Sequence, residues 1–210
     1  MDWSPQQDQA LRAVEKWVQH GSQQVFRLFG YAGTGKTTLA QEIASMVPKA
    51  LYGAFTGKAA LVLQRKGCAG ASTIHSLIYK PPKEDEETGE ARRRANGDLA
   101  FTLNRESEVK TADLVIIDEV SMVSEDLGAD LLSFGTKVLV LGDPAQLPPV
   151  KGTGYFTEAE PNVMLTEIHR QAADNPIIAM ATKVRQGETL VFGGYGESAV
   201  IQRDNLSQRI

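Results

Sequence analysis

A glycine-rich run that begins at Gly30 carries the clearest chemical signal in the sequence. Residues 30–37 read Gly-Tyr-Ala-Gly-Thr-Gly-Lys-Thr and fit G-x-x-x-x-G-K-[ST], between an apolar stretch and a segment of helical character. Glycines let successive backbone N–H groups face phosphate oxygens, and the following helix N-terminus adds partial positive charge. In such a loop Lys36 neutralises the β- and γ-phosphates and the Thr37 hydroxyl ligates Mg²⁺. The run therefore predicts a triphosphate site, in preference to an inert glycine turn. Its expected contacts are Gly33, Thr34, Gly35, Lys36, Thr37 and Thr38.

Two adjacent acids end an apolar run at residues 114–119, which reads Leu-Val-Ile-Ile-Asp-Glu. A strand of a parallel sheet would place Asp118 and Glu119 at the carboxyl edge, where ligands of open α/β sheets bind. There Asp118 is suited to hold Mg²⁺ through water, and Glu119 to orient and deprotonate an attacking water. The pair predicts hydrolysis. The alternative is a helix N-terminus that merely favours acids.

A third apolar run, residues 137–141, is followed by Gly-Asp-Pro-Ala-Gln. Its exit presents polar groups again, and Gln146 is a candidate sensor of the γ-phosphate. By itself the segment is better explained as an ordinary Gly-Asp-Pro turn.

The elements that must position these groups alternate between strand and helix. Ser4 and Pro5 read as an N-cap and first helical residue, and apolar residues follow at helical spacing. We expect strands at 25–29, 50–55, 113–118 and 137–141, and further helices at 36–46, 59–64, 74–79, 125–134 and 177–185. This alternation predicts an α/β fold whose parallel sheet is buried on both faces by helices.

Two segments depart from the alternation. Residues 80–110 are rich in charge, and within them residues 99–103 could form one arm of a small hairpin. We expect an insertion that projects from the core, because so polar a stretch cannot bury a face of its own. The tail from Gly187 is rich in glycine and then offers a strand at 199–202.

Composition sets the outer limits. The chain has 210 residues, 42% of them hydrophobic, and a formal net charge of -4, which is typical of a globular protein. Its length fits one sizeable core with an insertion or a short tail. No apolar run approaches the ~20 residues of a membrane span, so we expect no membrane and a cytoplasmic location. Cys68 is the single cysteine, and His20, His75 and His169 lack the spacing of a metal site.

Taken together, these motifs resemble the first motor lobe of superfamily 1 DNA helicases, in the 5′→3′ group of the RecD and Dda types. Residues 3–186 contain the family's motifs in the expected order, although Trp3 replaces the usual leucine. The matching segments are 55–60, 72–77, 118–122, 142–150 and 165–171. The resemblance implies a RecA-like P-loop NTPase fold with ATP and Mg²⁺ as cofactors.

The resemblance also implies roles for residues outside the phosphate loop. Gln7 matches the glutamine that reads adenine, and Arg170 matches an arginine aimed at the γ-phosphate, its alternative being a surface ion pair. Single-strand phosphates are the expected partners of Thr56, Lys58, Thr73 and His75. Packing within a helix explains His75 equally well. Phe101 lies where the family carries a pin that splits the duplex, and a solvated loop is the alternative there.

The implied domain organisation has three parts. Residues 1–79 and 111–186 form the ATP-binding motor lobe, residues 80–110 an inserted pin or wedge, and residues 187–210 a linker and the start of a truncated second lobe. The expected activity is ATP hydrolysis coupled to 5′→3′ translocation and duplex unwinding. Expected partners are single-stranded DNA, single–double-strand junctions, a second motor lobe, and replication or recombination proteins.

Other functions remain in competition at this point. An ATP-gated module that binds single-stranded DNA or regulates a partner, without motor activity, is the non-enzymatic alternative. A nucleotide kinase is disfavoured because no acceptor site or lid is recognisable, and a GTPase because no Asn-Lys-x-Asp stretch occurs.

Overall fold

A computed structural model describes residues 2–81, 101–146, 154–168, 175–196 and 198–201. The chain divides into two compact units, one formed by Met1–Gly30 with Lys36–Leu165, the other by Tyr31–Gly35 with Thr166–Ile210. The linker and second lobe expected at residues 187–210 stay a prediction. No helix among the described residues is long and apolar enough to cross a membrane.

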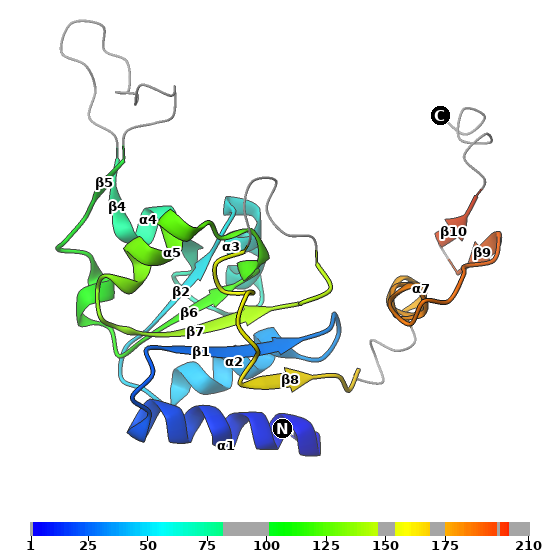
Figure 1. Ribbon diagram of the computed structural model, residues 1–210, viewed down its shortest axis with the longest axis horizontal. Helices are drawn as coiled ribbons and strands as arrows, with labels where there is room; N and C mark the ends of the chain where they lie inside the picture. Colours follow the sequence, from blue (N-terminus) through cyan, green and yellow to red (C-terminus); the bar gives the residue numbers. More distant parts are fainter. Residues whose placement is uncertain (1, 82–100, 147–153, 169–174, 197, 202–210) are drawn as a thin grey trace, which may run out of the picture. The chain divides into compact units, whose positions relative to one another are not determined.

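The first unit is built on a six-stranded sheet in which every pairing is parallel (Figure 1). The strand order is β3-β2-β6-β7-β1-β8. Their bounds are Val25–Gly30 for β1, Ala50–Ala54 for β2, Ser72–Thr73 for β3, Leu114–Asp118 for β6, Lys137–Gly142 for β7 and Val163–Leu165 for β8. The four strands expected from the sequence are confirmed to within a residue or two. Two edge strands, β3 and β8, were not predicted.

Helices cover both faces of this sheet (Figure 1). One face packs on α1 (Pro5–His20), α2 (Lys36–Ser45) and α3 (Gly57–Arg65), the other on α4 (Ile74–Ile78), α5 (Glu125–Leu132) and the 3₁₀ turns η1 (Glu108–Thr111) and η2 (Val120–Met122). In β6, Leu114 and Ile116 join the first cluster while Val115 joins the second, and all three are at most 1% exposed. The apolar run is continuous because successive side chains enter opposite layers.

The first helix begins as the sequence predicts. The Ser4 side chain accepts a hydrogen bond from the Gln7 backbone, and the Gln7 side chain accepts one from the Ser4 backbone, which together form a capping box. At the other end Lys137 Nζ donates to the carbonyls of Trp17 and Val18 at 2.7 and 2.8 Å. A cation at a helix C-terminus complements the helix dipole, so β7 fixes the end of α1.

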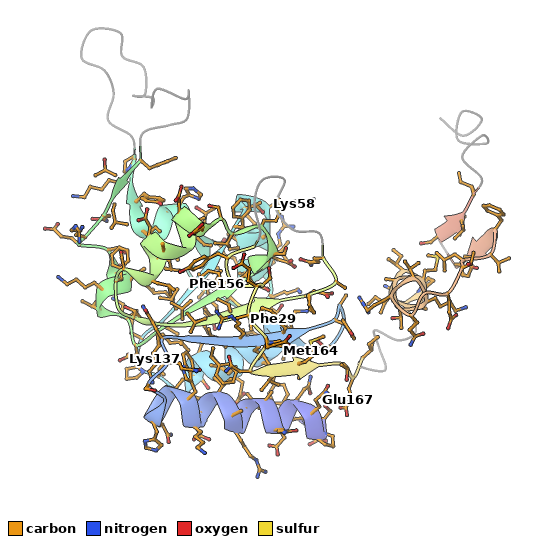
Figure 2. All side chains as sticks on the ribbon, in the orientation of Figure 1. Phe29, Lys58, Lys137, Phe156, Met164 and Glu167 are labelled. Atoms are coloured by element: carbon orange, nitrogen blue, oxygen red, sulfur yellow. The ribbon has the colours of Figure 1, made fainter. Side chains whose placement is uncertain are left out.

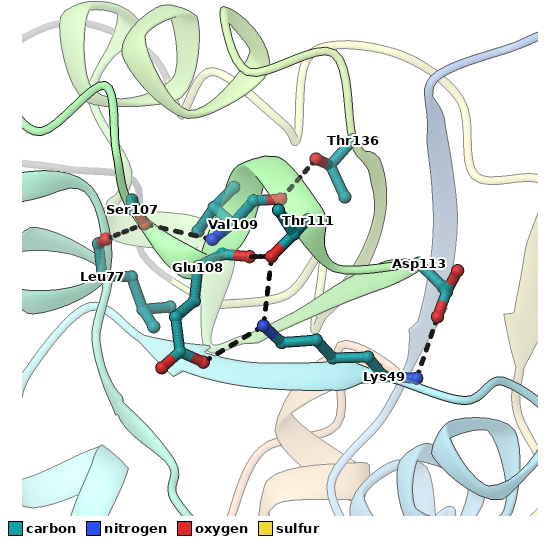
Figure 3. Close-up of polar contacts among 8 residues, drawn as sticks. All are labelled: Lys49, Leu77, Ser107, Glu108, Val109, Thr111, Asp113 and Thr136. Carbon is teal, nitrogen blue, oxygen red and sulfur yellow. Dashed lines mark hydrogen bonds and ion pairs between the residues drawn. The ribbon is translucent and has the colours of Figure 1, made fainter.

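The base of the charged insertion is joined to the core at both ends. Strands β4 (Tyr79–Lys80) and β5 (Thr102–Leu103) pair antiparallel, as a hairpin stem requires. Figure 3 shows the contacts of η1, where the Thr136 hydroxyl donates to the Val109 carbonyl at 2.6 Å and Ser107 donates to the Leu77 carbonyl at 2.5 Å. Val109 is fully buried. Residues 108–110, which the sequence analysis assigns to the insertion, thus belong to a turn that packs with the core.

The second unit contains α7 (Pro176–Arg185) and a hairpin of β9 (Gly193–Tyr195) with β10 (Ser198–Val200). Asn175 caps α7 by accepting from the first backbone N–H groups. Within this unit the Arg185 guanidinium lies 3.9 Å from the Tyr31 ring centroid, a cation–π contact. The helix predicted at 177–185 is confirmed, and the strand predicted at 199–202 begins one residue earlier.

Candidate nucleotide-binding site

Three adjacent strands end at the same edge of the sheet. β7 lies between β1 and β6, so the segments that follow these strands are brought together at the carboxyl edge. They are Gly30 and Lys36 on either side of the glycine-rich loop, Gly142 and Asp143 after the apolar residues of β7, and Asp118 and Glu119 at the end of β6. This edge is where ligands bind in open parallel sheets.

The loop between β1 and α2 has the backbone that its glycines allow. Gly33 and Gly35 have φ values of 82° and 83°, a left-handed conformation that side chains with a Cβ rarely adopt. Within the loop the Thr34 hydroxyl donates to the Tyr31 carbonyl at 2.9 Å, and Thr34 is 1% exposed. This hydrogen bond from the Thr34 hydroxyl therefore stabilises the conformation of the loop.

Lys36 is the first residue of α2, and its charge interacts with those of three carboxylates. Its Nζ donates to the Gly30 carbonyl at 2.6 Å. Burial lowers the pKa of Lys36, while the charges of Asp143, Asp118 and Glu119 act in the opposite direction, in that order of size. The formal side-chain charge of these four groups is one positive against three negative, or -2, and the charge of Lys66, which also acts on Lys36 and Asp118, offsets only part of it. An anionic ligand therefore needs a further cation to bind here.

The two acids that end β6 differ in their surroundings. Burial raises the pKa of Asp118, and the neighbouring charge of Glu119 raises it further. The Glu119 backbone N–H donates to Asp118 Oδ1 at 2.9 Å, which opposes that shift. Glu119 itself is exposed and is the only described non-glycine residue with positive φ, at 56°. Backbone conformations of this kind are costly and concentrate at functional sites.

Asp143 is a site residue that the sequence analysis missed. It is 6% exposed, its Oδ1 accepts the Ala145 N–H at 2.9 Å, and its charge acts most strongly on Lys36. A signal for it existed, because Asp143 follows an apolar strand as Asp118 ends one. From this segment the sequence analysis selected only Gln146 as a candidate site residue.

Gln146 lies at the same edge and contacts the segment after the two acids. The Ser121 hydroxyl donates to Gln146 Oε1 at 3.0 Å. Ser121 belongs to η2, directly after Glu119, so the third motif is joined to the second by a side-chain hydrogen bond.

The predicted strand-contacting threonines both cap helices. Thr56 accepts from the Ala59 N–H at 3.1 Å at the start of α3, and Thr73 accepts from the Ser76 N–H at 3.0 Å at the start of α4. Both helices begin where strands β2 and β3 end, hence at the same edge as the acids. Lys58 is exposed near the start of α3, and Figure 2 shows it far from Lys137, which begins β7 at the opposite edge.

His75 and Phe101 pack together with Tyr79 at the base of the insertion. The three ring centroids are 5.5 to 5.6 Å apart, and Tyr79 and Phe101 are stacked with an interplanar angle of 28°. The Tyr79 hydroxyl donates to Asp130 on α5 at 2.5 Å. Burial lowers the pKa of His75. The structure packs the half-buried His75 ring against Tyr79 and Phe101 and places Phe101 at the base of the stem, while a contact of His75 with DNA stays a prediction.

The structure gives positions for all but one of the remaining predicted site residues. Thr37 and Thr38 lie in the first turn of α2 and are half-buried. Gln7 is 3% exposed, and its side-chain oxygen serves the capping box of α1. Arg170 lies outside the described residues.

The groups at this edge fit a magnesium ion that is shared with phosphates. Mg²⁺ prefers hard oxygen ligands and usually takes only one or two from the protein, with waters and phosphate oxygens completing its shell. The Thr37 hydroxyl and the Asp118 carboxylate are ligands of that kind. Within the described parts of the chain, no group of three or more His, Cys, Asp or Glu side chains could hold a metal by itself.

A parallel sheet with a G-x-x-x-x-G-K-T loop after one strand and paired acids after another defines a P-loop ATPase of RecA-like fold. Residues 3–205 match the AAA domain family, and the chain belongs to that family. Its motifs place it with the motor lobes of superfamily 1 helicases of the RecD and Pif1 type.

Two curated relatives illustrate the likeness. The chain is 35% identical over 176 residues to the ATP-dependent RecD2 DNA helicase of Deinococcus radiodurans, a match that covers 79% of this chain and 22% of that protein. It is 30% identical over 158 residues to uncharacterized protein R530 of Acanthamoeba polyphaga mimivirus, which covers 64% of this chain and 31% of the relative. The chain thus spans between a fifth and a third of the length of these relatives.

Solved structures agree on the fold. The crystal structure of Pif1 from Bacteroides sp in complex with ADP-AlF4 is 25% identical, with a TM-score of 0.56, and the match covers 90% of this chain and 47% of that one. The Bacteroides Pif1 complex with ADP-AlF3 and single-stranded DNA has a TM-score of 0.60 at 23% identity, over 90% of this chain and 48% of that one.

Proposed function

We propose that this chain is the ATP-binding motor lobe of a DNA helicase that couples ATP hydrolysis to 5′→3′ translocation on single-stranded DNA and to duplex unwinding. The observation that carries the proposal is the position of Lys36 among Asp118, Glu119 and Asp143 at the carboxyl edge of the sheet. The likeness to the ATP-dependent RecD2 DNA helicase supports DNA as the substrate, and the proposed 5′→3′ direction rests on the resemblance in sequence motifs.

The residues divide the work of hydrolysis among them. Backbone N–H groups of residues 33–38 bind the phosphates, and Lys36 leaves the Gly30 carbonyl to neutralise the β- and γ-phosphates. Thr37 and Asp118 hold Mg²⁺, which supplies the positive charge that a site of formal charge -2 lacks. Glu119, exposed on its left-handed turn, accepts a proton from the attacking water.

Two further side chains act on the γ-phosphate in this proposal. Gln146 senses it from the end of β7, and Arg170 stabilises the charge that develops as the phosphoryl group transfers. Gln7 contributes adenine recognition from the first turn of α1. These three roles rest on the resemblance in sequence. They specify the mechanism further than membership of the P-loop ATPase class does.

Single-stranded DNA is proposed to pass over the helices that follow β2 and β3. At the start of α3, Thr56 fixes the first turn and exposed Lys58 adds a full positive charge to the partial charge of the helix N-terminus. Thr73 and His75 occupy the corresponding place on α4. Contacts of this kind position a strand by its phosphates and do not read its sequence.

The insertion is proposed to act at junctions of single and double strands. Phe101 stacks on Tyr79 and contacts His75, so it supports the base of the stem formed by β4 and β5. In a motor that contains both lobes, we expect Phe101→Ala to reduce unwinding while sparing ATP hydrolysis stimulated by single-stranded DNA. Unchanged unwinding would remove Phe101 from this role.

A complete motor is proposed to need more than this lobe. Translocation requires two lobes that close on ATP and reopen after hydrolysis, and we propose that residues 187–210 lead into the second. The 210-residue chain should accordingly bind nucleotide and unwind poorly alone. Replication or recombination proteins are proposed partners of the complete motor.

The test is ATP hydrolysis with and without single-stranded DNA, for this chain and for Glu119→Gln. Strong stimulation that Glu119→Gln abolishes supports a motor. Tight ATP-dependent DNA binding without turnover would instead indicate an ATP-gated binding or regulatory module. Phosphate transfer to a nucleotide acceptor would indicate a kinase and contradict the proposal.

A further inference from the structure

The hydrogen bond between Ser121 and Gln146 joins two motifs that are otherwise separate in sequence. Ser121 Oγ donates to Gln146 Oε1 at 3.0 Å. Ser121 is 6% exposed, whereas Gln146 is exposed. A buried, short side chain therefore holds a long side chain that would otherwise sample many rotamers in solvent.

The turn that carries Ser121 is closely packed on two sides. Its first residue, Val120, is fully buried, and a Cβ added at Gly142 would lie 3.0 Å from Val120 Cγ2. On the other side, a Cβ added at Gly154 would lie 2.8 Å from the Ser121 carbonyl oxygen. A Cβ at position 154 would clash with the Ser121 backbone and one at position 142 would crowd the Val120 side chain, so η2 packs closely against both glycines. Ser121 is consequently a fixed point at this edge of the sheet.

The direction of the hydrogen bond sets which end of the Gln146 amide meets a ligand. A glutamine side chain has an oxygen that only accepts and a nitrogen that donates two hydrogens. With Oε1 engaged by the serine hydroxyl, Nε2 is the end of the amide that this hydrogen bond leaves for a ligand. A phosphate oxygen accepts hydrogen bonds, so this orientation attracts it, and the inverted amide would repel it.

We propose that Ser121 is a positioning residue for Gln146, which it orients so that the amide nitrogen donates to the γ-phosphate. The inference rests on the proposed ATPase function and deepens it. Because η2 begins directly after Glu119, the same turn sets the positions of Glu119 and of the amide. The serine hydroxyl thereby aligns two groups that act on one phosphoryl group.

A double-mutant cycle on ATP hydrolysis tests this role. Ser121→Ala is expected to lower kcat about tenfold with little change in KM for ATP, because the hydroxyl acts through Gln146 and not on the bound nucleotide. Gln146→Ala should lower kcat at least as much, and the double variant no further. Ser121→Thr, which keeps the hydroxyl, should retain most of the activity.

Two further variants keep the test decisive. Ser124→Ala is the matched control, since Ser124 is exposed and makes no side-chain cap with α5. Its kcat should equal that of the unmodified chain. In a Gln146→Glu background the amide nitrogen is absent, so Ser121→Ala should have no additional effect. Thermal melting establishes that each variant is folded.

The outcomes separate this inference from the function on which it rests. Failure of the unmodified chain to hydrolyse ATP would contradict the proposed function. Hydrolysis by the unmodified chain with an unaffected Ser121→Ala variant would overturn the positioning role alone. The positioning role would also be overturned if the kcat of the double variant fell by the product of the two single losses. Such independent effects would mean that the serine does not act through Gln146.

Discussion

Replacement of Lys36 by alanine tests the electrostatics of the site. Its charge interacts with those of Asp118, Glu119 and Asp143, so the formal side-chain charge of these four groups changes from -2 to -3. Unit charges ~4 Å apart interact by ~4 kcal/mol at an effective dielectric constant of 20. The lysine is only half-buried, so we expect a smaller loss of about 3 kcal/mol in ATP binding, or roughly a hundredfold in Kd.

The assay is a titration with a fluorescent ATP analogue in the presence of Mg²⁺. Lys58→Ala is the matched control, because it removes a lysine of equal charge that is exposed at the start of α3. Its nucleotide affinity should stay within about twofold, by the small effects expected for exposed charges. A Lys36→Ala variant that is folded and binds the analogue within threefold of the unmodified chain would refute the reasoning.

Three other substitutions probe separate parts of the structure. Glu119→Gln should retain nucleotide binding but lower single-turnover hydrolysis by about 10²–10⁴-fold, as loss of a general base does, and a change under tenfold would contradict that role. Gly128→Ala should lower the thermal midpoint by several degrees, because its Cβ would lie 2.1 Å from Tyr155 Cδ1 and overpacking costs about 1–3 kcal/mol. Gly57→Ala is its control, because a Cβ at that position would have no atom within 4 Å, and it should not lower the thermal midpoint. Burial lowers the pKa of His75 in the folded state, so protonation favours unfolding and stability should fall as pH drops through about 6.5. His75→Phe should flatten that dependence in denaturant titrations at pH 7.5 and 5.5, and an unchanged slope would exclude His75 as its source.

The features that sequence predicted well are those that local patterns determine. The strand at Val25–Gly30, the loop after it and the helix from Lys36 are specified by consecutive residues, since glycines set the turn and an apolar run sets the strand. The capping box of Ser4 and Gln7 is likewise a local pattern. The carboxyl-edge position of Asp118 followed from a general property of parallel sheets.

The features that sequence missed depend on contacts between distant segments. Strand β8 has three residues and pairs with β1 from more than 130 residues away, so nothing local marks it. Asp143 lies at the carboxyl edge between the ends of β1 and β6 because β7 is placed between these strands, an order that the sequence does not specify. The hydrogen bond from Ser121 to Gln146 and the stacking of Phe101 on Tyr79 arise only after the sheet has formed.

Calorimetric titration of the unmodified chain with ATP, with Mg²⁺ and then with a chelator, tests the central claim most directly. A site of formal charge -2 that presents Thr37 and Asp118 should give saturable heat with Mg²⁺ and far weaker binding without it. Absence of heat in the presence of Mg²⁺, or equal affinity in both titrations, would contradict the account.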